Sequence, residues 1–245
     1  MPFQGRLSVQ VVATMHKYAR TEESIMARTP RIAFLHTGAV VIAPVGDLAR
    51  EHLGDATTIN YLDDKIVADL GDAQLAASVP DRIADLVQAA RSAGADIVML
   101  TCSSISHLAA PTAERIGIPV LRIDEAMADE AVATGARIAV LATLATTLTP
   151  TTALIRERAA LAGASPEISS EVIDGAFAAV SAGDRPAHDR LVAAAIERAA
   201  ASADVVVLAQ ASMASAAAVA TVDVPVLTSL EPGIKRLREA VDALA

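Results

Sequence analysis

The sequence has little of several things that would point to common classes of function. It contains one cysteine, no tryptophan and 2% aromatic residues, and its 20 basic side chains face 29 acidic ones. A single cysteine excludes an internal disulfide framework and any cysteine-rich zinc or iron–sulfur site, and it fits a reducing cytoplasm. Because basic clusters and aromatic side chains for base stacking are scarce, we do not expect nucleic acid as a partner.

Long apolar runs and cofactor motifs are missing too. The chain is 53% hydrophobic, but no segment approaches the roughly 18 uninterrupted apolar residues of a membrane helix. No glycine-rich phosphate loop follows the first predicted strand, and the five histidines show no metal-ligand spacing. We therefore expect no membrane partner, no metal and no cofactor. The scarcity of aromatic residues favours a small polar substrate.

From Arg31 onward, short apolar runs alternate with longer Ala-rich amphipathic stretches, which is typical of an α/β fold with parallel strands. The predicted strands are Arg31–His36, Ala56–Tyr61, Asp96–Thr101, Val120–Ile123, Arg137–Ala142, Glu167–Val172, Asp204–Ala209 and Val226–Thr228. Predicted helices include Val79–Ala93, Pro150–Ala162 and Arg185–Ser202. We expect residues 1–27 to be a poorly ordered N-terminal extension, with a docked helix as the alternative.

An internal repeat organises these elements. Residues 93–105 align without a gap on residues 201–213, and residues 31–37 align on residues 137–143 in the same order. The repeat predicts two similar α/β domains with parallel sheets, related by a pseudo-twofold axis, with a ligand site in the cleft between them. The alternative is that Ala-rich strand–helix units resemble one another by composition alone.

Cys102 is the strongest candidate for chemistry. It follows a predicted strand and precedes Ser103 and Ser104, where we expect the chain to turn into a helix. The free N–H groups and positive potential of a helix start would lower the pKa of the thiol, making Cys102 a usable acid, base or nucleophile. The two serines would cap that helix or bind a substrate anion. The alternative is a small buried cysteine that only fills space.

Other polar residues follow predicted strands. Gln210 aligns with Cys102 in the repeat, and it can hydrogen bond but cannot exchange protons at neutral pH. His36 ends the first strand and could be a second proton-transfer group facing Cys102, or a hydrogen-bonded surface residue. Hydroxyls that could bind a carboxylate with the next helix start, or simply cap that helix, follow another strand: Thr143, Thr146 and Thr147.

These motifs, taken in order, resemble the aspartate/glutamate racemase superfamily over about residues 31–240. The superfamily also includes hydantoin racemases, maleate isomerases and arylmalonate decarboxylases. The matching segments are His36-Thr37, Thr101-Cys102-Ser103-Ser104, Leu141-Ala142-Thr143 with Thr146-Thr147, and Leu208-Ala209-Gln210-Ala211-Ser212-Met213.

The resemblance implies an organisation and a chemistry. The domains would exchange their ends, with a first domain of residues 28–123 plus 229–245 and a second of residues 124–228. The reaction would be cofactor-independent proton transfer at the carbon next to the carboxylate of a small acid, and the protein would form a homodimer. The resemblance implies Cys102 as a catalytic residue, and we expect Gln210 and His36 to complete the catalytic set. We expect these residues to bind the substrate: Thr37, Thr101, Ser103, Ser104, Thr143, Thr146, Thr147 and Ser212.

The sequence departs from the family at Gln210, which stands where a second cysteine is common. Racemisation by two thiols is therefore excluded. Three hypotheses remain. Cys102 could serve a racemase or isomerase, with water, His36 or a threonine as the other partner. It could instead protonate the product of a decarboxylase acting on a malonate-like or β-keto acid, although that branch keeps its thiol in the second motif. The third hypothesis is a non-catalytic carboxylate-binding protein.

Overall fold

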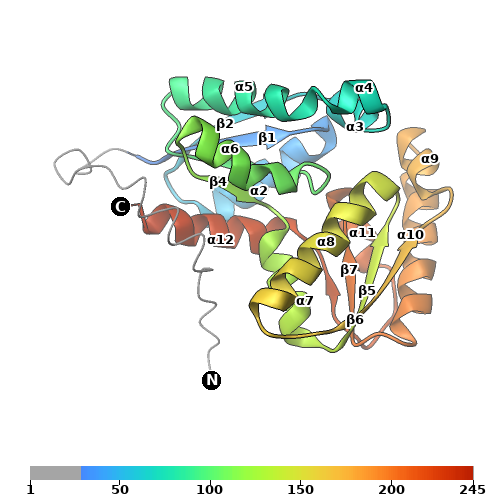
Figure 1. The fold of residues 1–245 in the computed structure, drawn as a ribbon. Helices are drawn as coiled ribbons and strands as arrows, with labels where there is room; N and C mark the ends of the chain where they lie inside the picture. Colours follow the sequence, from blue (N-terminus) through green and yellow to red (C-terminus); the bar gives the residue numbers. More distant parts are fainter. Residues whose placement is uncertain (1–28, 245) are drawn as a thin grey trace.

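The computed structural model describes residues 29–244, and these form two four-stranded parallel sheets with helices on both faces (Figure 1). This confirms the predicted α/β class and its pair of parallel sheets. The expectation for residues 1–27 lies outside the described residues. No helix in the described range is long and apolar enough to span a bilayer.

The two sheets have the same strand order, β2-β1-β3-β4 in the first and β6-β5-β7-β8 in the second. The register also corresponds, because Ala33 pairs with Val98 in the first sheet and Ala139 pairs with Val206 in the second. The strands are β1 Arg31–His36, β2 Thr57–Leu62, β3 Ile97–Leu100, β4 Val120–Arg122, β5 Arg137–Ala142, β6 Glu167–Val172, β7 Val205–Leu208 and β8 Val226–Leu227.

The helices and short 3-10 turns connect these strands. The α-helices are α2 Ile42–His52, α3 Ile66–Asp69, α4 Ala73–Ala76, α5 Val79–Ser92, α6 Ala109–Ile116, α7 Glu125–Thr134, α8 Ala145–Leu161, α9 Ala176–Ser181, α10 Arg185–Ala200, α11 Ala214–Ala217 and α12 Leu230–Asp242. The 3-10 turns are η2 Ala39–Val41, η3 Ser106–Leu108 and η4 Ala211–Met213.

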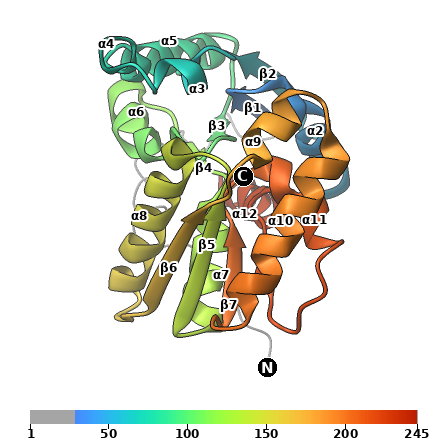
Figure 2. The ribbon, with the colours of Figure 1, turned by 90° about the vertical axis from the view of Figure 1, so that its right-hand side faces the viewer.

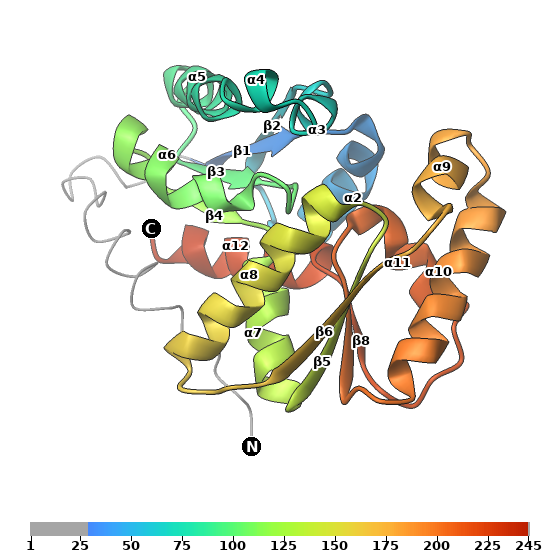
Figure 3. The ribbon, with the colours of Figure 1, turned by 45° about the vertical axis from the view of Figure 1, so that its right-hand side comes forward.

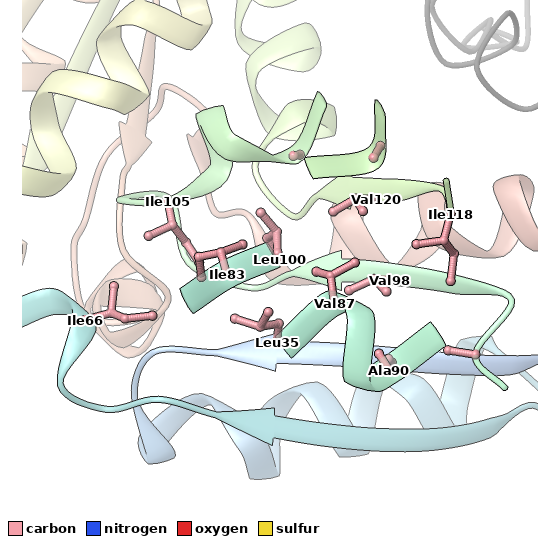
Figure 4. Packing of buried hydrophobic residues seen from close by; sticks show 14 of the residues in the cluster. Leu35, Ile66, Ile83, Val87, Ala90, Val98, Leu100, Ile105, Ile118 and Val120 are labelled. Atoms are coloured by element: carbon pink, nitrogen blue, oxygen red, sulfur yellow. The ribbon is translucent and has the colours of Figure 1, made fainter. Parts of the chain in front are cut away.

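The inner strands β1 and β3 of the first sheet are buried on both faces, as their almost uninterrupted apolar sequences predict, whereas the edge strand β2 is partly exposed. Alternate residues of β1 point to opposite sides, so Ile32 and Phe34 pack with α2 and α12, while Ala33 and Leu35 pack with α5 and α6. Figure 4 shows the second of these clusters, with Val87 of α5 lying against the sheet.

The second sheet is covered in the same way, by α7 and α8 on one face and by α9, α10 and α11 on the other (Figure 2). Helix α7 follows β4 and packs its Met127 and Ala131 on this second sheet. Helix α12 follows β8 but packs Ile234 and Leu237 on the first sheet. The chain therefore crosses between the two α/β units twice after β4.

Partly buried ion pairs join α12 to the helices of the second unit. Arg236 of α12 lies 2.6 Å from a carboxylate oxygen of Asp129 in α7, and Arg158 of α8 pairs with the same carboxylate. Arg158 also lies 3.4 Å from Glu125. Because these charges have lost part of their contact with water, each partner compensates some of the lost hydration of the other. The cluster fixes how the two units meet.

Gly233 permits the close approach of α12 to the end of β4. A Cβ atom at this position would lie 2.3 Å from the main-chain oxygen of Ile123. Because the obstructing atom belongs to the backbone, the clash cannot be relieved by a side-chain rotation. Glycine is therefore required here for packing rather than for a special backbone angle.

The predicted boundaries of β1, β5 and β6 agree with the structure, and the other strands differ by one or two residues. The prediction for α8 was wrong at its start, because the helix begins at Ala145 and contains Pro150. A proline in the second turn costs one main-chain hydrogen bond, which the buried face of this helix offsets. Thr146 and Thr147 consequently lie inside the helix rather than before it.

Candidate functional site

A pocket lies where strand ends of the two units face each other. Its walls include Thr101 and Cys102, which follow β3, and Ala209 and Gln210, which follow β7. Its volume of about 420 Å³ lies within the range of small-molecule sites. Figure 3 shows β1 and β3 in one half of the molecule and β5 and β8 in the other. The placement matches the usual position of ligands at the carboxyl ends of parallel strands.

Most of the polar residues predicted for the site line this pocket, whereas three do not. The lining residues among them are Thr37, Thr101, Cys102, Ser103, Ser104, Thr147, Gln210 and Ser212. Those outside the lining are His36, Thr143 and Thr146. The structure thus brings together hydroxyls from both units around one thiol.

The setting of Cys102 corrects the expectation of a helix start. The chain makes a turn through residues 103–105, and η3 begins at Ser106 with α6 following at Ala109. Neither Ser103 nor Ser104 caps a helix. The positive end of a helix is therefore not available to the thiol.

The pKa of the Cys102 thiol is raised, not lowered as the sequence predicted. Part of Cys102 is accessible from the pocket, but protein atoms surround the sulfur on its other sides, and this burial raises its pKa. Hydrogen bonds from the Thr37 hydroxyl and from the main chain and hydroxyl of Ser104 oppose the effect. The resting group at neutral pH is therefore a protonated thiol that has donors ready to stabilise its thiolate.

Ser104 also connects the two units across the pocket. Its hydroxyl oxygen lies 3.0 Å from the hydroxyl oxygen of Thr147 in α8, within hydrogen-bond distance, and both side chains are buried. A buried hydroxyl pair of this kind is costly to break, because either partner would lose its hydrogen bond without access to bulk water. The contact holds the thiol's turn against the second unit.

Gln210 occupies the opposite wall in a fixed orientation. Its side-chain oxygen accepts hydrogen bonds from the main-chain N–H of Thr143 at 2.6 Å and from the Thr143 hydroxyl at 2.9 Å. Because a main-chain N–H can only donate, the oxygen must face Thr143 and the NH₂ group is left to donate to other partners. Thr143 itself is buried behind Gln210.

His36 does not face the pocket as predicted. It is fully buried, with one ring nitrogen 2.8 Å from the Thr101 hydroxyl and the other 2.8 Å from the side-chain oxygen of Asn60. Burial lowers the pKa of its imidazole, while the hydrogen bond to Asn60 raises it. His36 is therefore a neutral group that holds Thr101 from behind and has no direct access to a ligand.

Arg185 is a pocket residue that the sequence analysis missed. It begins α10, lines the pocket and donates a hydrogen bond of 2.7 Å to the main-chain oxygen of Ser212. Nothing in the sequence distinguishes it from the other arginines at helix ends. It is nevertheless the one pocket-lining residue with a formal charge in residues 29–244.

Asp124 is a second feature that only the three-dimensional structure reveals. It is fully buried after β4 and accepts a 2.9 Å hydrogen bond from the Ser106 hydroxyl, and Arg122 lies 3.7 Å from its other oxygen. Burial raises the pKa of the Asp124 carboxyl, and its charge contributes to raising the pKa of Cys102. The charge of Asp124 thus disfavours the thiolate form of Cys102.

Within the part of the chain that the structure describes, no group of three or more His, Cys, Asp or Glu residues could hold a metal ion.

The lining of the pocket is less polar than the sequence analysis led us to expect, because a small polar substrate would need polar walls. A second set of lining residues is apolar, and all but Leu144, which directly precedes α8, belong to short helical segments: Val40, Val41, Val67, Leu144, Phe177 and Val180.

Comparison with known proteins gives a consistent assignment. The family model for Asp/Glu/hydantoin racemases matches residues 36–237, which is more than half of the chain. No curated protein sequence shows a significant match.

Solved structures share the fold at low sequence identity. An allantoin racemase from Klebsiella pneumoniae is 20% identical with a TM-score of 0.61, and the match covers 88% of this chain and 89% of that one. A glutamate racemase from Francisella tularensis in complex with D-glutamate is 15% identical with a TM-score of 0.69, covering 87% and 81%. An arylmalonate decarboxylase is 21% identical with a TM-score of 0.54, covering 88% and 93%. At these identities the structures establish similarity of fold.

Proposed function

The chain belongs to the Asp/Glu/hydantoin racemase family, and from this premise we propose that it catalyses cofactor-independent proton transfer at the carbon next to a carboxylate, with Cys102 carrying the proton. The observation that supports this most strongly is the position of the chain's single thiol, on the wall of a pocket between the two units and within a set of hydrogen-bond donors. A residue that only filled space would have no need of such donors.

The proposed step uses both forms of the thiol. The Cys102 thiol first releases its proton to water. The resulting thiolate removes the proton from the carbon next to the carboxylate, and the electron pair of that bond moves into the carboxylate to give an enediolate. The NH₂ group of Gln210 and the hydroxyl of Ser212 donate hydrogen bonds to the oxygens that gain charge. The thiol then returns a proton to the carbon. Return of a proton by the same thiol to the same face gives exchange at that carbon, and a racemase needs in addition a proton delivered to the opposite face.

Gln210 restricts what the opposite face can do. Since its amide cannot exchange protons, a proton delivered from that face must come from water or from another group. His36 is fully buried and outside the pocket lining, so we do not assign it this step. Proton exchange by Cys102 on one face is thus the minimum reaction that the site supports.

Decarboxylation is the second candidate, and the raised pKa of Cys102 favours it. In this reaction the bond between the carbon and one carboxylate breaks, CO₂ leaves, and the electron pair remains as an enediolate of the other carboxylate. The protonated thiol then donates its proton to the carbon and is reprotonated from water. A thiol that rests in its acid form is suited to this single donation.

Incubation in D₂O with amino acids, hydantoins, hydroxy acids, malonates and β-keto acids tests the proposal. Deuterium incorporation and CO₂ release are followed together in the wild type, in Cys102→Ala and in the control Ser92→Ala, which alters an exposed residue of α5. We expect a signal in the wild type and the control that is lost in Cys102→Ala. Deuterium without CO₂ identifies an exchange reaction, and CO₂ with one deuterium identifies a decarboxylase. Silence across the panel contradicts both and supports the carboxylate-binding protein.

A further inference from the structure

The pocket has two parts of different chemistry. Its deep part carries the polar groups around Cys102 and Gln210, which follow strands β3 and β7. Its outer part is formed by short helical segments that present apolar side chains, above all Val40 in η2 and Phe177 in α9. These two side chains are 57% and 42% exposed. Apolar groups gathered around the mouth of a pocket mark the place where an apolar part of a ligand loses its contact with water.

The formal charge of the pocket has one sign. Arg185 is the only charged side chain in the lining formed by residues 29–244, and no aspartate or glutamate contributes to the walls. Arg185 uses one donor for the main-chain oxygen of Ser212, and a guanidinium carries five N–H donors. Arg185, Ser212 and the NH₂ group of Gln210 therefore form one patch of donors on the second unit, suited to an anion.

The same charge distribution disfavours an ammonium group. An amino acid would bring a positive charge next to the reacting carbon, inside a pocket where Arg185 repels it and no carboxylate lines the wall. The hydroxyls can accept hydrogen bonds from an ammonium group, but they cannot compensate its charge. Asp124, the nearby carboxyl, lies buried beneath the turn and outside the lining.

We infer that the substrate of this pocket is a carboxylic acid that carries an apolar substituent and no free amino group on the reacting carbon, with Arg185 binding its carboxylate. The apolar substituent extends toward Val40 and Phe177, and the reacting carbon faces Cys102. The inference rests on the proposed function, because it identifies the class of acid that the same site accepts. It also replaces the small polar substrate that the scarcity of aromatic residues suggested.

Binding measured by calorimetry at constant salt tests the substrate class. Phenylacetate supplies the carboxylate and an apolar group, phenylglycine adds only the ammonium group, and acetate removes only the ring. We expect phenylacetate to bind at least about tenfold more tightly than either, because phenylglycine buries an uncompensated charge and acetate loses apolar contact. Phenylglycine or acetate binding as tightly as phenylacetate overturns the inference.

Two variants test the residues assigned to the anion and the apolar group. Arg185→Gln should weaken phenylacetate binding by about tenfold or more, while Arg190→Gln, an exposed residue of the same helix outside the pocket, should leave it unchanged. Phe177→Ser alters an exposed side chain, and it should weaken phenylacetate binding without weakening acetate binding. If Arg185→Gln folds and binds phenylacetate with unchanged affinity, Arg185 does not bind the carboxylate. If Arg185→Gln does not fold, unchanged phenylacetate affinity in Phe177→Ser overturns the substrate class.

The outcomes separate this inference from the proposed function. If the binding preferences hold but no acid of the preferred class exchanges deuterium or loses CO₂ in a Cys102-dependent way, the proposed function is wrong and the ligand class stands. If Cys102-dependent turnover is found only with amino acids, the proposed function stands and the inferred substrate class is wrong.

Discussion

The side chain of Gln210 is held by Thr143 through two hydrogen bonds to one oxygen, at 2.6 Å from the main-chain N–H and 2.9 Å from the hydroxyl. In the internal repeat Thr143 corresponds to Thr37, and Gln210 corresponds to Cys102. Thr37 in turn hydrogen bonds to Cys102. In each unit, a threonine that follows the first strand thus positions a functional side chain that follows the third strand. Only the first unit carries a side chain at this position, Cys102, that can exchange protons.

This relationship predicts that Gln210 acts as a hydrogen-bond donor. Replacement by leucine keeps a similar size but removes the NH₂ group, and we expect kcat to fall about 10²–10³-fold, as when one donor to a developing negative charge is lost. Thr143→Ser retains both donors to Gln210 and should stay near wild type. Steady-state kinetics on the acid found in the D₂O screen provides both numbers. An unchanged kcat in Gln210→Leu would show that this amide does not stabilise the transition state.

The raised pKa of Cys102 predicts slow alkylation at neutral pH. Only the thiolate reacts with iodoacetamide, so the rate should stay low between about pH 6 and 8 and rise only above the ordinary thiol pKa of about 8.5. Thr37→Val removes a donor to the thiolate and should move the rise to still higher pH. Mass spectrometry of the intact protein follows the reaction. A rise in rate centred below about pH 7 would contradict the burial effect.

The same shift has a consequence for stability. The unfolded thiol ionises at about pH 8.5, whereas the folded thiol keeps its proton to higher pH, so the folded state binds more protons in that interval. The free energy of unfolding should therefore fall as pH rises above about 8.5. Cys102→Ala should lack this part of the pH dependence.

Gly233 predicts a destabilising response to a normally favourable substitution. Alanine in a helix is ordinarily more stable than glycine by about 0.5–1 kcal/mol, and Gly46→Ala in α2 should show this gain, since its nearest neighbour is a flexible arginine end at 3.6 Å. Gly233→Ala should instead lose about 1–3 kcal/mol, because its methyl group meets the backbone of Ile123. Urea denaturation of both variants measures the difference. Equal stabilisation by the two would refute the close packing of α12.

Much of the fold follows from local pattern. Apolar runs such as Arg31–His36 and Arg137–Ala142 have the length and composition of buried parallel strands, and their predicted limits agree with the structure. The limit of this reasoning shows at α8. Proline is favoured at the first position of a helix, so Pro150 was interpreted as a start, whereas packing against the second sheet extends the helix back to Ala145.

The site was less predictable because its properties depend on tertiary surroundings. The sequence places Cys102 and Gln210 at strand ends, and both line the pocket. It does not show how deeply the thiol is buried, so the direction of its pKa shift was predicted wrongly. Likewise, His36 was expected in the cleft because it ends a strand, but strand ends at the sheet centre can be covered, and Thr101 lies between it and the pocket.

The central claim is that the Cys102 sulfur carries the reaction, and reversible blocking tests it most directly. Cys102 is the only cysteine, so methyl methanethiosulfonate at alkaline pH can modify one sulfur with a small methylthio group. With the acid found in the D₂O screen, turnover should fall in proportion to the modified fraction and return fully when dithiothreitol removes the group. Full modification that leaves turnover unchanged would contradict the claim.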